Sequence, residues 1–390
     1  MTAAITGLGA ITCLGATAPA SWKALLAGQS GISALTDEWA APLPVRIAGR
    51  VAGDADEPFA ITAAREAWAD AGLTEVDPER LAVCVGSALG GLEVAEVNSL
   101  RLRDGKRLSP YTIPAFMANS AAATVAIEFD AKAGCYCPTS ACASGAEAIA
   151  QGLALIRAGL ADVVIAGGAE AAITSFTIAG FAAAQALSRR NDAPQQASRP
   201  FDVRRDGFVL SEGAAIVILE STAHAAARGA QPYAHVAGAG VTSDAYHLTA
   251  PAPDGAQQLR AMRLALAEAD LDAFALACVA AHASSTQTGD AVEAQAIAAL
   301  LGKAATNCIV TATKSQTGHL LGAAGALQAV FAALTIRDRV IPATINLDEP
   351  DANLPIDVAL KPIALPPGDA AVLANSFGFG GQNVSLVFIP

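Results

Sequence analysis

Four residues that can do chemistry stand in short segments rich in glycine, alanine and hydroxyl side chains. Cys142 lies in "TSACASG", where small neighbours leave a thiol approachable. A helix expected to begin near Ser144 would place its N-terminus at that thiol and favour a thiolate. His282 lies in "VAAHASSTQTGD", and His319 follows Lys314 by five residues in "TATKSQTGHLLGAAG". We expect both histidines in turns directly after strands, where open α/β sheets bind ligands.

A thiolate beside two imidazoles suits acyl transfer through a thioester, and it also suits an enolate left when a β-carboxyl group is lost. Other enzyme classes fit less well. No G-x-S-x-G motif of serine hydrolases occurs. A cysteine protease needs one histidine and an orienting Asn or Asp, so the second histidine and Lys314 would have no role. Gly7 and Gly9 imitate a dinucleotide fingerprint, but Thr12 occupies the third glycine position, so a nucleotide cofactor is not expected.

The elements that must position these residues alternate along the chain. Short apolar runs typical of strands are followed by alanine-rich helical stretches, which is the α/β pattern. Four features recur in the same order: "ITGLGAIT" resembles "VAGAGVTS", "LAVCVGSA" resembles "LACVAAHA", a small-residue turn leads into an apolar helix, and a strand ends in glycine-rich sequence. We therefore predict two similar halves, residues 1–222 and 223–390. Main helices are expected at 63–71, 144–158, 255–269 and 322–336.

Composition limits the classes of partner. The chain has 390 residues, of which 53% are hydrophobic and 15% charged, enough for a large core, and its formal net charge is −12. This charge argues against nucleic acid as a partner. The only basic cluster, residues 101–107, is typical of a solvated loop, although it could dock an acidic protein. The apolar run at 320–336 is short for a membrane span, so we expect a buried helix.

Seven scattered cysteines form no disulfide framework, and the N-terminal segment has no basic region typical of a secretory signal. Both observations favour the cytoplasm. Cys135 and Cys137 resemble half of a metal site, but no second Cys or His pair follows at ligand spacing. We expect no metal.

At these motifs the sequence resembles the β-ketoacyl-acyl-carrier-protein synthases, the elongating condensing enzymes of the thiolase superfamily. The resemblance covers almost the whole chain and runs in the family's order: "ITGLGAITCLG", "TSACASG", "RPFDVRRDGFVLSEGA", "SDAYHLTAPAPDG", "AHASSTQTGD", "TKSQTGHLLGAAGA" and "NSFGFGGQN". It implies the thiolase fold, an α/β architecture in which two similar halves pack as a layered αβαβα unit.

The resemblance also implies a mechanism. Cys142 would take an acyl chain from the phosphopantetheine of an acyl carrier protein or from coenzyme A. Malonyl carrier protein would then lose CO₂, and His282 and His319 would hold the enolate that attacks the acyl-cysteine. The product is a β-ketoacyl carrier two carbons longer. Substrates arrive on the carrier's phosphopantetheine, so no cofactor of the enzyme's own is implied.

Further residues take roles from the same resemblance. The backbone N–H groups of Cys142 and Phe379 would form the oxyanion hole, and Phe379 with Gly378 and Gly380 would form a mobile gate at the entrance. Ser284 and Thr286 match hydroxyls that hold the pantetheine arm. Lys314 would organise the site with Asp290 and Glu293, two carboxylates that would otherwise be interpreted as a solvated helix face.

Several positions depart from the family's pattern. Ala280 replaces an asparagine, and Gln328 replaces a glutamate that faces the lysine and, in some members, helps to bind a monovalent cation. Ser284 and Gln382 each replace a threonine. Between residues 51 and 63 the chain lacks about ten residues, a basic segment that helps relatives to dock the carrier. Docking must therefore differ.

The departures leave two assignments open. The main one is a β-ketoacyl synthase of fatty-acid type, and the alternative is the ketosynthase subunit of a type II polyketide or polyene system with a chain-length-factor partner. A thiolase would need a second cysteine near the C-terminal glycine loop, and an initiating synthase an asparagine where His319 stands. A catalytically dead subunit would lack Cys142. The resemblance implies a dimer, either a homodimer or a heterodimer.

Overall fold

A computed structural model describes residues 2–53, 57–368 and 370–390. Within these residues the main sheet has ten strands in the order β10-β9-β13-β14-β8-β1-β7-β6-β4-β5. Their bounds are β1 Ala3–Ile11, β4 Leu81–Gly86, β5 Cys135–Tyr136, β6 Val163–Glu170, β7 Gly213–Ser221, β8 Ala234–Ser243, β9 Leu276–Ala280, β10 Ile309–Thr311, β13 Ala371–Gly378 and β14 Gln382–Ile389. Two small ladders pair β2 (Ser33–Ala34) with β3 (Ile47–Ala48) and β11 (Val340–Ile341) with β12 (Ile363–Ala364).

The two halves of the sheet have the same topology. From the outer edge inward, one half has the order β10-β9-β13-β14-β8, and the corresponding strands of the other half have the order β5-β4-β6-β7-β1. The outer strands of each half run parallel, β10 with β9 and β13 in one half and β5 with β4 and β6 in the other. The inner strands of both halves pair antiparallel. The halves meet where β1 pairs with β8, over residues 3–5 and 234–236. The repeat predicted from sequence therefore corresponds to two matching five-stranded units, although helix α8 crosses the proposed boundary at 222 and that boundary stays a prediction.

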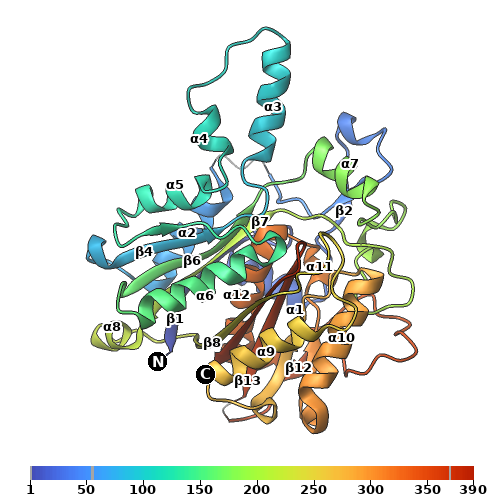
Figure 1. Cartoon of the computed structure of the whole chain (residues 1–390). Coiled ribbons are helices and arrows are strands. Elements are labelled where there is room, and N and C mark those ends of the chain that lie inside the picture. The colour runs from blue at the N-terminus through green and yellow to red at the C-terminus, as the bar shows by residue number, and fades with distance from the viewer. Residues whose placement is uncertain (1, 54–56, 369) are drawn as a thin grey trace.

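Helices cover the outer faces of both halves and fill the space between them (Figure 1). In Figure 1, α2 and α5 lie over the first half, α9 and α10 over the second, and α6 and α12 between the two, which gives the αβαβα layers. The helix bounds are α1 Ala18–Leu26, α2 Phe59–Ala71, α3 Leu92–Arg103, α4 Thr112–Phe116, α5 Ser120–Glu128, α6 Ser144–Arg157, α7 Ser175–Ala183, α8 Thr222–Ala227, α9 Ala256–Glu268, α10 Gln287–Leu301, α11 Lys314–Thr317 and α12 Ala324–Asp338.

Glycines allow α6 and α12 to meet closely at their N-terminal ends. A Cβ atom on Gly145 would lie 2.7 Å from the carbonyl oxygen of Gly322, and one on Gly325 would lie 2.8 Å from the backbone nitrogen of Ala146. Both distances are too short for a real side chain, so only glycine permits this approach. The segments that carry Cys142 and His319 lead into these two helices and are thereby brought together.

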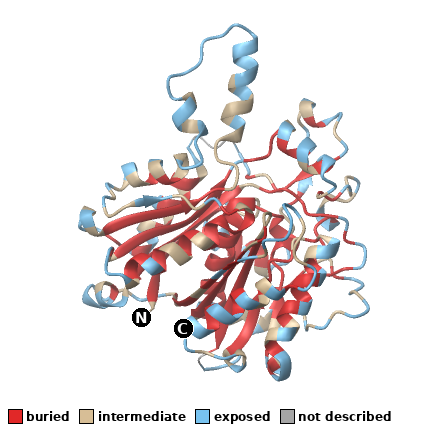
Figure 2. Cartoon of the chain, viewed as in Figure 1, coloured by how far each residue is buried: buried red, intermediate tan, exposed pale blue. Residues whose placement is uncertain are grey.

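The apolar helix expected at 322–336 is α12, which is buried from Ala324 to Ile336 (Figure 2). It is apolar on all sides because sheet halves and α6 surround it. Among the described residues, no helix is both long enough and apolar enough to cross a membrane.

An arm made of α3, a loop and α4 projects from the body of the molecule (Figure 1). None of its helical residues is buried, and Figure 2 shows it as exposed or intermediate along its length. The basic residues 101–107 lie at the end of α3 and in the loop that follows. Neither helix was predicted from the sequence, because a helix with no buried face has no strong apolar period.

Candidate active site

Cys142 lies in a tight turn that is held from both sides. It occupies the 3₁₀ turn Ala141–Ala143 directly before α6, and Ala141 has a φ of 51°, a left-handed conformation that is unusual for alanine. Ser144 fixes the turn, since its hydroxyl accepts from the backbone N–H of Ser140 at 3.0 Å and donates to the carbonyl of Ala141 at 2.6 Å. Gly378 closes over it: a Cβ there would lie 3.1 Å from the backbone nitrogen of Cys142.

Burial of Cys142 acts against the thiolate expected from the sequence. Burial raises the pKa of its thiol to about 11, although the charge of Lys314 and a hydrogen bond from the backbone N–H of Phe379 act in the opposite direction. Burial therefore favours a thiol near neutral pH, and the thiolate expected from the sequence stays a prediction.

The two histidines reach the site from different kinds of segment. His282 follows β9 directly, as expected. His319 does not follow a strand, because α11 intervenes after β10. It is held instead by a short parallel bridge, in which its N–H donates to the carbonyl of Val209 and its own carbonyl accepts from the N–H of Ser211. The two imidazole rings lie edge to face with centroids 5.2 Å apart.

Both imidazoles are neutral. Burial, together with the positive charge of Lys314, holds the pKa of His282 and of His319 well below the usual range. Among the described residues, neither Nδ1 atom has a hydrogen-bond partner. Each ring therefore keeps hydrogen-bonding capacity that the protein itself does not use.

Lys314 supports the turn of His282 from behind. Its Nζ donates to the carbonyl of His282 at 2.6 Å and to Oε1 of Gln328 at 3.4 Å. Gln328 in turn donates to the carbonyl of Ala281 at 2.6 Å. Burial lowers the pKa of Lys314 to about 8. At the position where relatives have a glutamate, the amide of Gln328 thus bonds directly to the lysine and to backbone carbonyls.

The carboxylates of α10 are buried, so their alternative interpretation as a solvated face is wrong. Glu293 accepts from the backbone N–H groups of His282 at 2.7 Å and Ala283 at 2.6 Å, and from Asn375 at 3.1 Å. Asp290 accepts from the N–H of Ser285 at 3.1 Å, and burial raises its pKa to about 7.

The expected link from these carboxylates to Lys314 is not a direct contact. No hydrogen bond among the described residues joins the lysine to either carboxylate, although both attract its charge and favour its protonated form. Lysine and carboxylates instead hold the turn at His282 separately, from its carbonyl side and its N–H side.

One cavity of about 880 Å³ brings the expected residues together. Its lining includes Cys142, His282, His319, Ser284, Thr286, Glu293, Gly378 and Phe379. Gly380 does not line it; its N–H donates to the carbonyl of Leu248, and its φ of +82° needs a glycine. The hydroxyls of Ser284 and Thr286 lie 3.2 Å apart. Lys314 and Asp290 act from behind the lining.

Glu170, a buried carboxylate at the end of β6, was not predicted from the sequence. It accepts from the N–H groups of Ala88 at 2.8 Å, Leu89 at 3.2 Å and Gly322 at 3.0 Å. Ala88 and Leu89 line the cavity. Glu170 therefore joins the wall near the nucleophile to the segment after His319. The acidic residue that ends the apolar strand "DVVIAGGAE" was the available signal.

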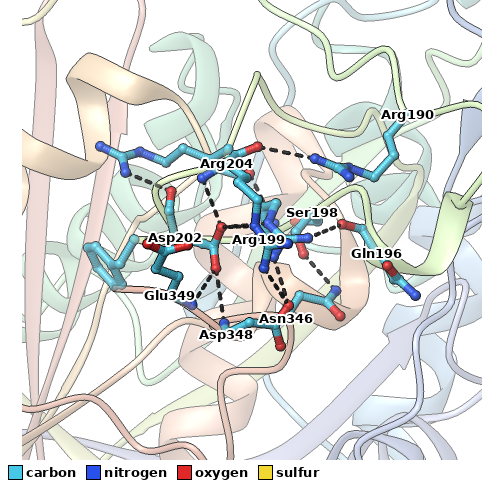
Figure 3. A network of polar contacts seen from close by, with 12 residues as sticks. Arg190, Gln196, Ser198, Arg199, Asp202, Arg204, Asn346, Asp348 and Glu349 are labelled. Carbon is cyan, nitrogen blue, oxygen red and sulfur yellow. Dashed lines mark hydrogen bonds and ion pairs between the residues drawn. The ribbon is translucent and has the colours of Figure 1, made fainter. Parts of the chain in front are cut away.

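A second missed feature is the buried Arg199 network behind the site (Figure 3). The Arg199 guanidinium pairs with Asp202 at 2.8 Å and with Asp348 at 2.9 Å, and both Arg199 and Asp202 are buried. The backbone N–H of Arg199 donates to the hydroxyl of Ser285. The network thus connects segment 199–204 to the turn that carries His282 and Ser284. The motif "RPFDVRRDG" carries the resemblance to the family, and its charged residues were the available signal for this network.

Two further expectations from the sequence concern the shortened segment between residues 51 and 63 and the absence of a metal site. Residues 54–56, within the segment expected to be shortened, lie outside the described residues. Among those that are described, no three His, Cys, Asp or Glu side chains gather as a metal site requires.

Comparison with known proteins agrees with this architecture. The model of the β-ketoacyl synthase N-terminal domain matches residues 52–225, and that of the C-terminal domain matches residues 233–348. A 3-oxoacyl-[acyl-carrier-protein] synthase 2 of Synechocystis sp. is 42% identical over 98% of this chain and 97% of that protein. The protein of the same description from Vibrio cholerae is 40% identical over 98% of both.

Solved structures show the same fold over the whole chain. A β-ketoacyl synthase from Burkholderia phymatum superposes with a TM-score of 0.91 at 34% identity, covering 100% of this chain and 99% of that one. A ketosynthase of a type II polyketide synthase, solved with its acyl-carrier protein, gives a TM-score of 0.93 at 32% identity, with coverage of 100% and 99%. The thiolase fold inferred from sequence is confirmed, and the chain belongs to the β-ketoacyl synthase family.

Proposed function

We propose that this chain is an acyltransferase of the 3-oxoacyl-[acyl-carrier-protein] synthase type, which condenses an acyl thioester with malonyl carrier protein and extends the chain by two carbons. The observation that carries the proposal is the single cavity in which Cys142 meets two neutral histidines. The relatives described as 3-oxoacyl-[acyl-carrier-protein] synthase 2, at 40–42% identity over nearly full length, support it.

In the first step the sulfur of Cys142 attacks the acyl thioester carbonyl. Because the thiol is protonated at rest, its proton must leave as the S–C bond forms, and a neutral imidazole beside it can accept that proton. The proton then passes to the departing pantetheine thiolate, so the carrier leaves as a thiol. The N–H groups of Cys142 and Phe379 hold the oxygen of the tetrahedral intermediate.

In the second step a malonyl thioester enters and its C–C bond to the carboxylate breaks, releasing CO₂. The electron pair forms an enolate whose oxygen accepts hydrogen bonds from His282 and His319. A neutral imidazole carries one N–H, which it can donate to the enolate oxygen. The enolate carbon attacks the acyl-cysteine, and the sulfur of Cys142 leaves as a thiolate that takes a proton from solvent. Lys314, Glu293 and Asp290 position the turn of His282 throughout.

Substrates would arrive on the phosphopantetheine of an acyl carrier protein, so the proposal needs no cofactor or metal of the enzyme's own. Ser284 and Thr286 would contact the arm, and the loop of Phe379 and its neighbouring glycines would gate entry. Residues 101–107, exposed at the end of the arm, are our candidate docking surface for the acidic carrier. Charge reversal there should raise the KM for carrier-bound substrates more than for pantetheine thioesters.

We further propose a dimer in the cytoplasm. Outside residues 101–107, the arm and its surroundings expose large apolar side chains, including Tyr111, Ile113, Phe116 and Ile127, beside the edge strand β5 of the nucleophile half. Sedimentation of the purified chain tests this assembly, and a monomer at micromolar concentration would refute it.

A second assignment is favoured by one observation. The structural neighbour with a TM-score of 0.93 is a type II polyketide ketosynthase, and another neighbour at 31% identity is described as a ketosynthase/chain length factor. A heterodimer with a chain-length-factor-like subunit is therefore the alternative to a homodimer. Activity of the chain alone would exclude the need for such a subunit.

Decarboxylation tests the proposed chemistry separately from acyl transfer. His319→Ala should lower the release of CO₂ from malonyl carrier protein by at least about tenfold, because the enolate loses a hydrogen-bond donor in a buried site. His224→Ala, in the distant helix α8, is the matched control and should leave the rate unchanged. Unchanged CO₂ release from the His319 variant would contradict the assignment.

A further inference from the structure

Gln258 is a polar side chain of the cavity lining whose carboxamide oxygen has nothing to bind. It lies in the first turn of α9, is 3% exposed and lines the cavity. Among the described residues, no donor reaches its Oε1 atom. A buried amide without a partner destabilises a fold, so such groups in native proteins are normally paired with protein, water or ligand.

Neighbouring polar groups of the lining are already paired with each other. Asn383 donates to a carboxylate oxygen of Asp244 at 2.7 Å, and the hydroxyls of Ser284 and Thr286 lie within hydrogen-bond distance. The carboxylate of Glu293 accepts three hydrogen bonds from the protein. Gln258 differs from all of them, since its acceptor is buried and vacant.

The position of Gln258 in the fold indicates which part of a substrate it faces. One turn further along α9, the sulfur of Met262 contacts the amide of Asn375, which also bonds Glu293 behind the turn of His282. Gln258 therefore lies on the face of α9 that packs toward the catalytic turn. It belongs to the half of the molecule that supplies the hydroxyl-bearing and amide-bearing lining, including Ser284, Thr286, Gln287 and Thr288.

The apolar part of the lining comes mainly from other elements. Ala88 and Leu89 follow β4, Phe181 lies in α7, and Leu321 precedes α12. These side chains suit an acyl chain, whereas the polar side suits the arm that delivers it. Gln287 and Thr288 are exposed while Cys142 is buried, so the polar side leads from the surface toward the nucleophile.

We propose that Gln258 binds the pantetheine arm of the substrate through its side-chain carboxamide. The arm carries secondary amides, and a carboxamide is complementary to such a group: its oxygen accepts the amide N–H and its NH₂ group donates to the amide carbonyl. The inference rests on the proposed function, because it assumes that a pantetheine thioester enters this cavity. It adds a binding residue that the sequence resemblance did not supply.

The test measures binding without chemistry. In a Cys142→Ala background, which cannot be acylated, the Kd of hexanoyl-pantetheine is measured by calorimetry with and without Gln258→Leu. Leucine keeps a similar volume but removes the hydrogen bonds, so we expect the Kd to rise about 5- to 10-fold. Gln257→Leu is the matched control, because the side-chain amide oxygen of Gln257 already accepts a hydrogen bond from Arg260. The Kd of hexanoyl-pantetheine for this control should stay within twofold of the background value. The proposal would be overturned if hexanoyl-pantetheine bound the Gln258→Leu variant as tightly as the Cys142→Ala background, or if it did not bind the background protein.

A second measurement separates binding from a structural role. Since the amide of Gln258 has no partner for its oxygen in the empty site, Gln258→Leu should leave the Tm unchanged or raise it. In the enzyme with Cys142 intact, the same variant should raise the KM for hexanoyl-pantetheine with little change in kcat. A lowered Tm together with losses in both parameters would indicate a structural residue and contradict the proposal.

These outcomes remain distinct from failure of the proposed function. If Gln258→Leu weakens binding but hexanoyl-pantetheine never acylates Cys142, the arm site stands and the condensing activity fails. If acylation proceeds normally and the Gln258 variant binds as tightly as its background, the activity stands and the arm site fails.

Discussion

At the scale of single residues, the site depends on groups whose ionisation is set by burial. Cys142, His282 and His319 are all held in their neutral forms by burial. The buried cation Lys314 lowers the pKa of each of the three. Neutral groups in a buried site avoid the cost of desolvating charge until a substrate arrives. Activation of the thiol must then accompany acylation rather than precede it.

This account predicts the pH dependence of alkylation at Cys142. Below its pKa of about 11 the thiolate fraction rises with pH, so the rate of reaction with iodoacetamide should rise about tenfold per pH unit from pH 7 to 8. Above pH 8 the rise should be shallower, because Lys314 loses the charge that lowers the thiol pKa. Mass spectrometry of the peptide containing Cys142 measures the rate. A plateau at or below pH 8 would indicate a stabilised thiolate and contradict the account.

At the scale of elements, the turn before α6 and the end of β13 must fit within a few tenths of an ångström. A Cβ on Gly378 would lie 2.7 Å from the carbonyl oxygen of Ser140 and 3.1 Å from the nitrogen of Cys142. Either the turn or the strand end must move to accommodate it. Such a shift would misplace the two N–H groups proposed to bind the oxyanion.

Gly378→Ala should therefore lower kcat for acylation of Cys142 by about 100-fold, because displacements near 1 Å in an active site have effects of this size. The measurement is the single-turnover rate of acyl transfer. Gly180→Ala provides the control: a Cβ there meets nothing within 4 Å, and alanine in α7 should leave the rate unchanged. Equal rates for both variants would show that the close approach is unimportant.

The sequence was most informative about elements that carry a strong pattern. The main strands and the four helices near 63, 144, 255 and 322 were predicted from apolar runs, and motif resemblance found the residues that meet in the cavity. Prediction from the sequence failed for properties that tertiary contacts determine. Burial of Asp290, the neutral thiol of Cys142 and the bond between Lys314 and Gln328 depend on neighbours distant in the chain, and the arm α3–α4 lacks any buried face to predict.

At the scale of the whole molecule, one buried ion-pair network joins segments that are distant in sequence (Figure 3). Asp202 accepts from the Arg199 guanidinium and from the backbone N–H groups of Asp348 and Glu349, and its pKa is held below the usual range chiefly by that guanidinium against the opposing effect of burial. Its stabilising contribution is present at neutral pH and is lost as the pH falls far enough to protonate it.

Asp202→Asn should lower the free energy of unfolding by about 3–5 kcal/mol, because it removes the buried partner of Arg199 and leaves only the exposed carboxylate of Asp348 beside that buried charge. Thermal unfolding at pH 7 measures the loss as a lowered Tm. Asp130→Asn is the control, since its pair with Lys132 is exposed and should contribute less than about 1 kcal/mol. A Tm for the Asp202 variant equal to that of the control would show that the network does not support the fold.

The central claim is that Cys142 carries the acyl group between carriers. Its most direct test is the intact mass of the purified chain after incubation with short acyl carrier proteins, beside a Cys142→Ala variant. We predict a mass gain of one acyl group in the natural chain and none in the variant. An unmodified natural chain, or the same gain in the variant, would contradict the claim.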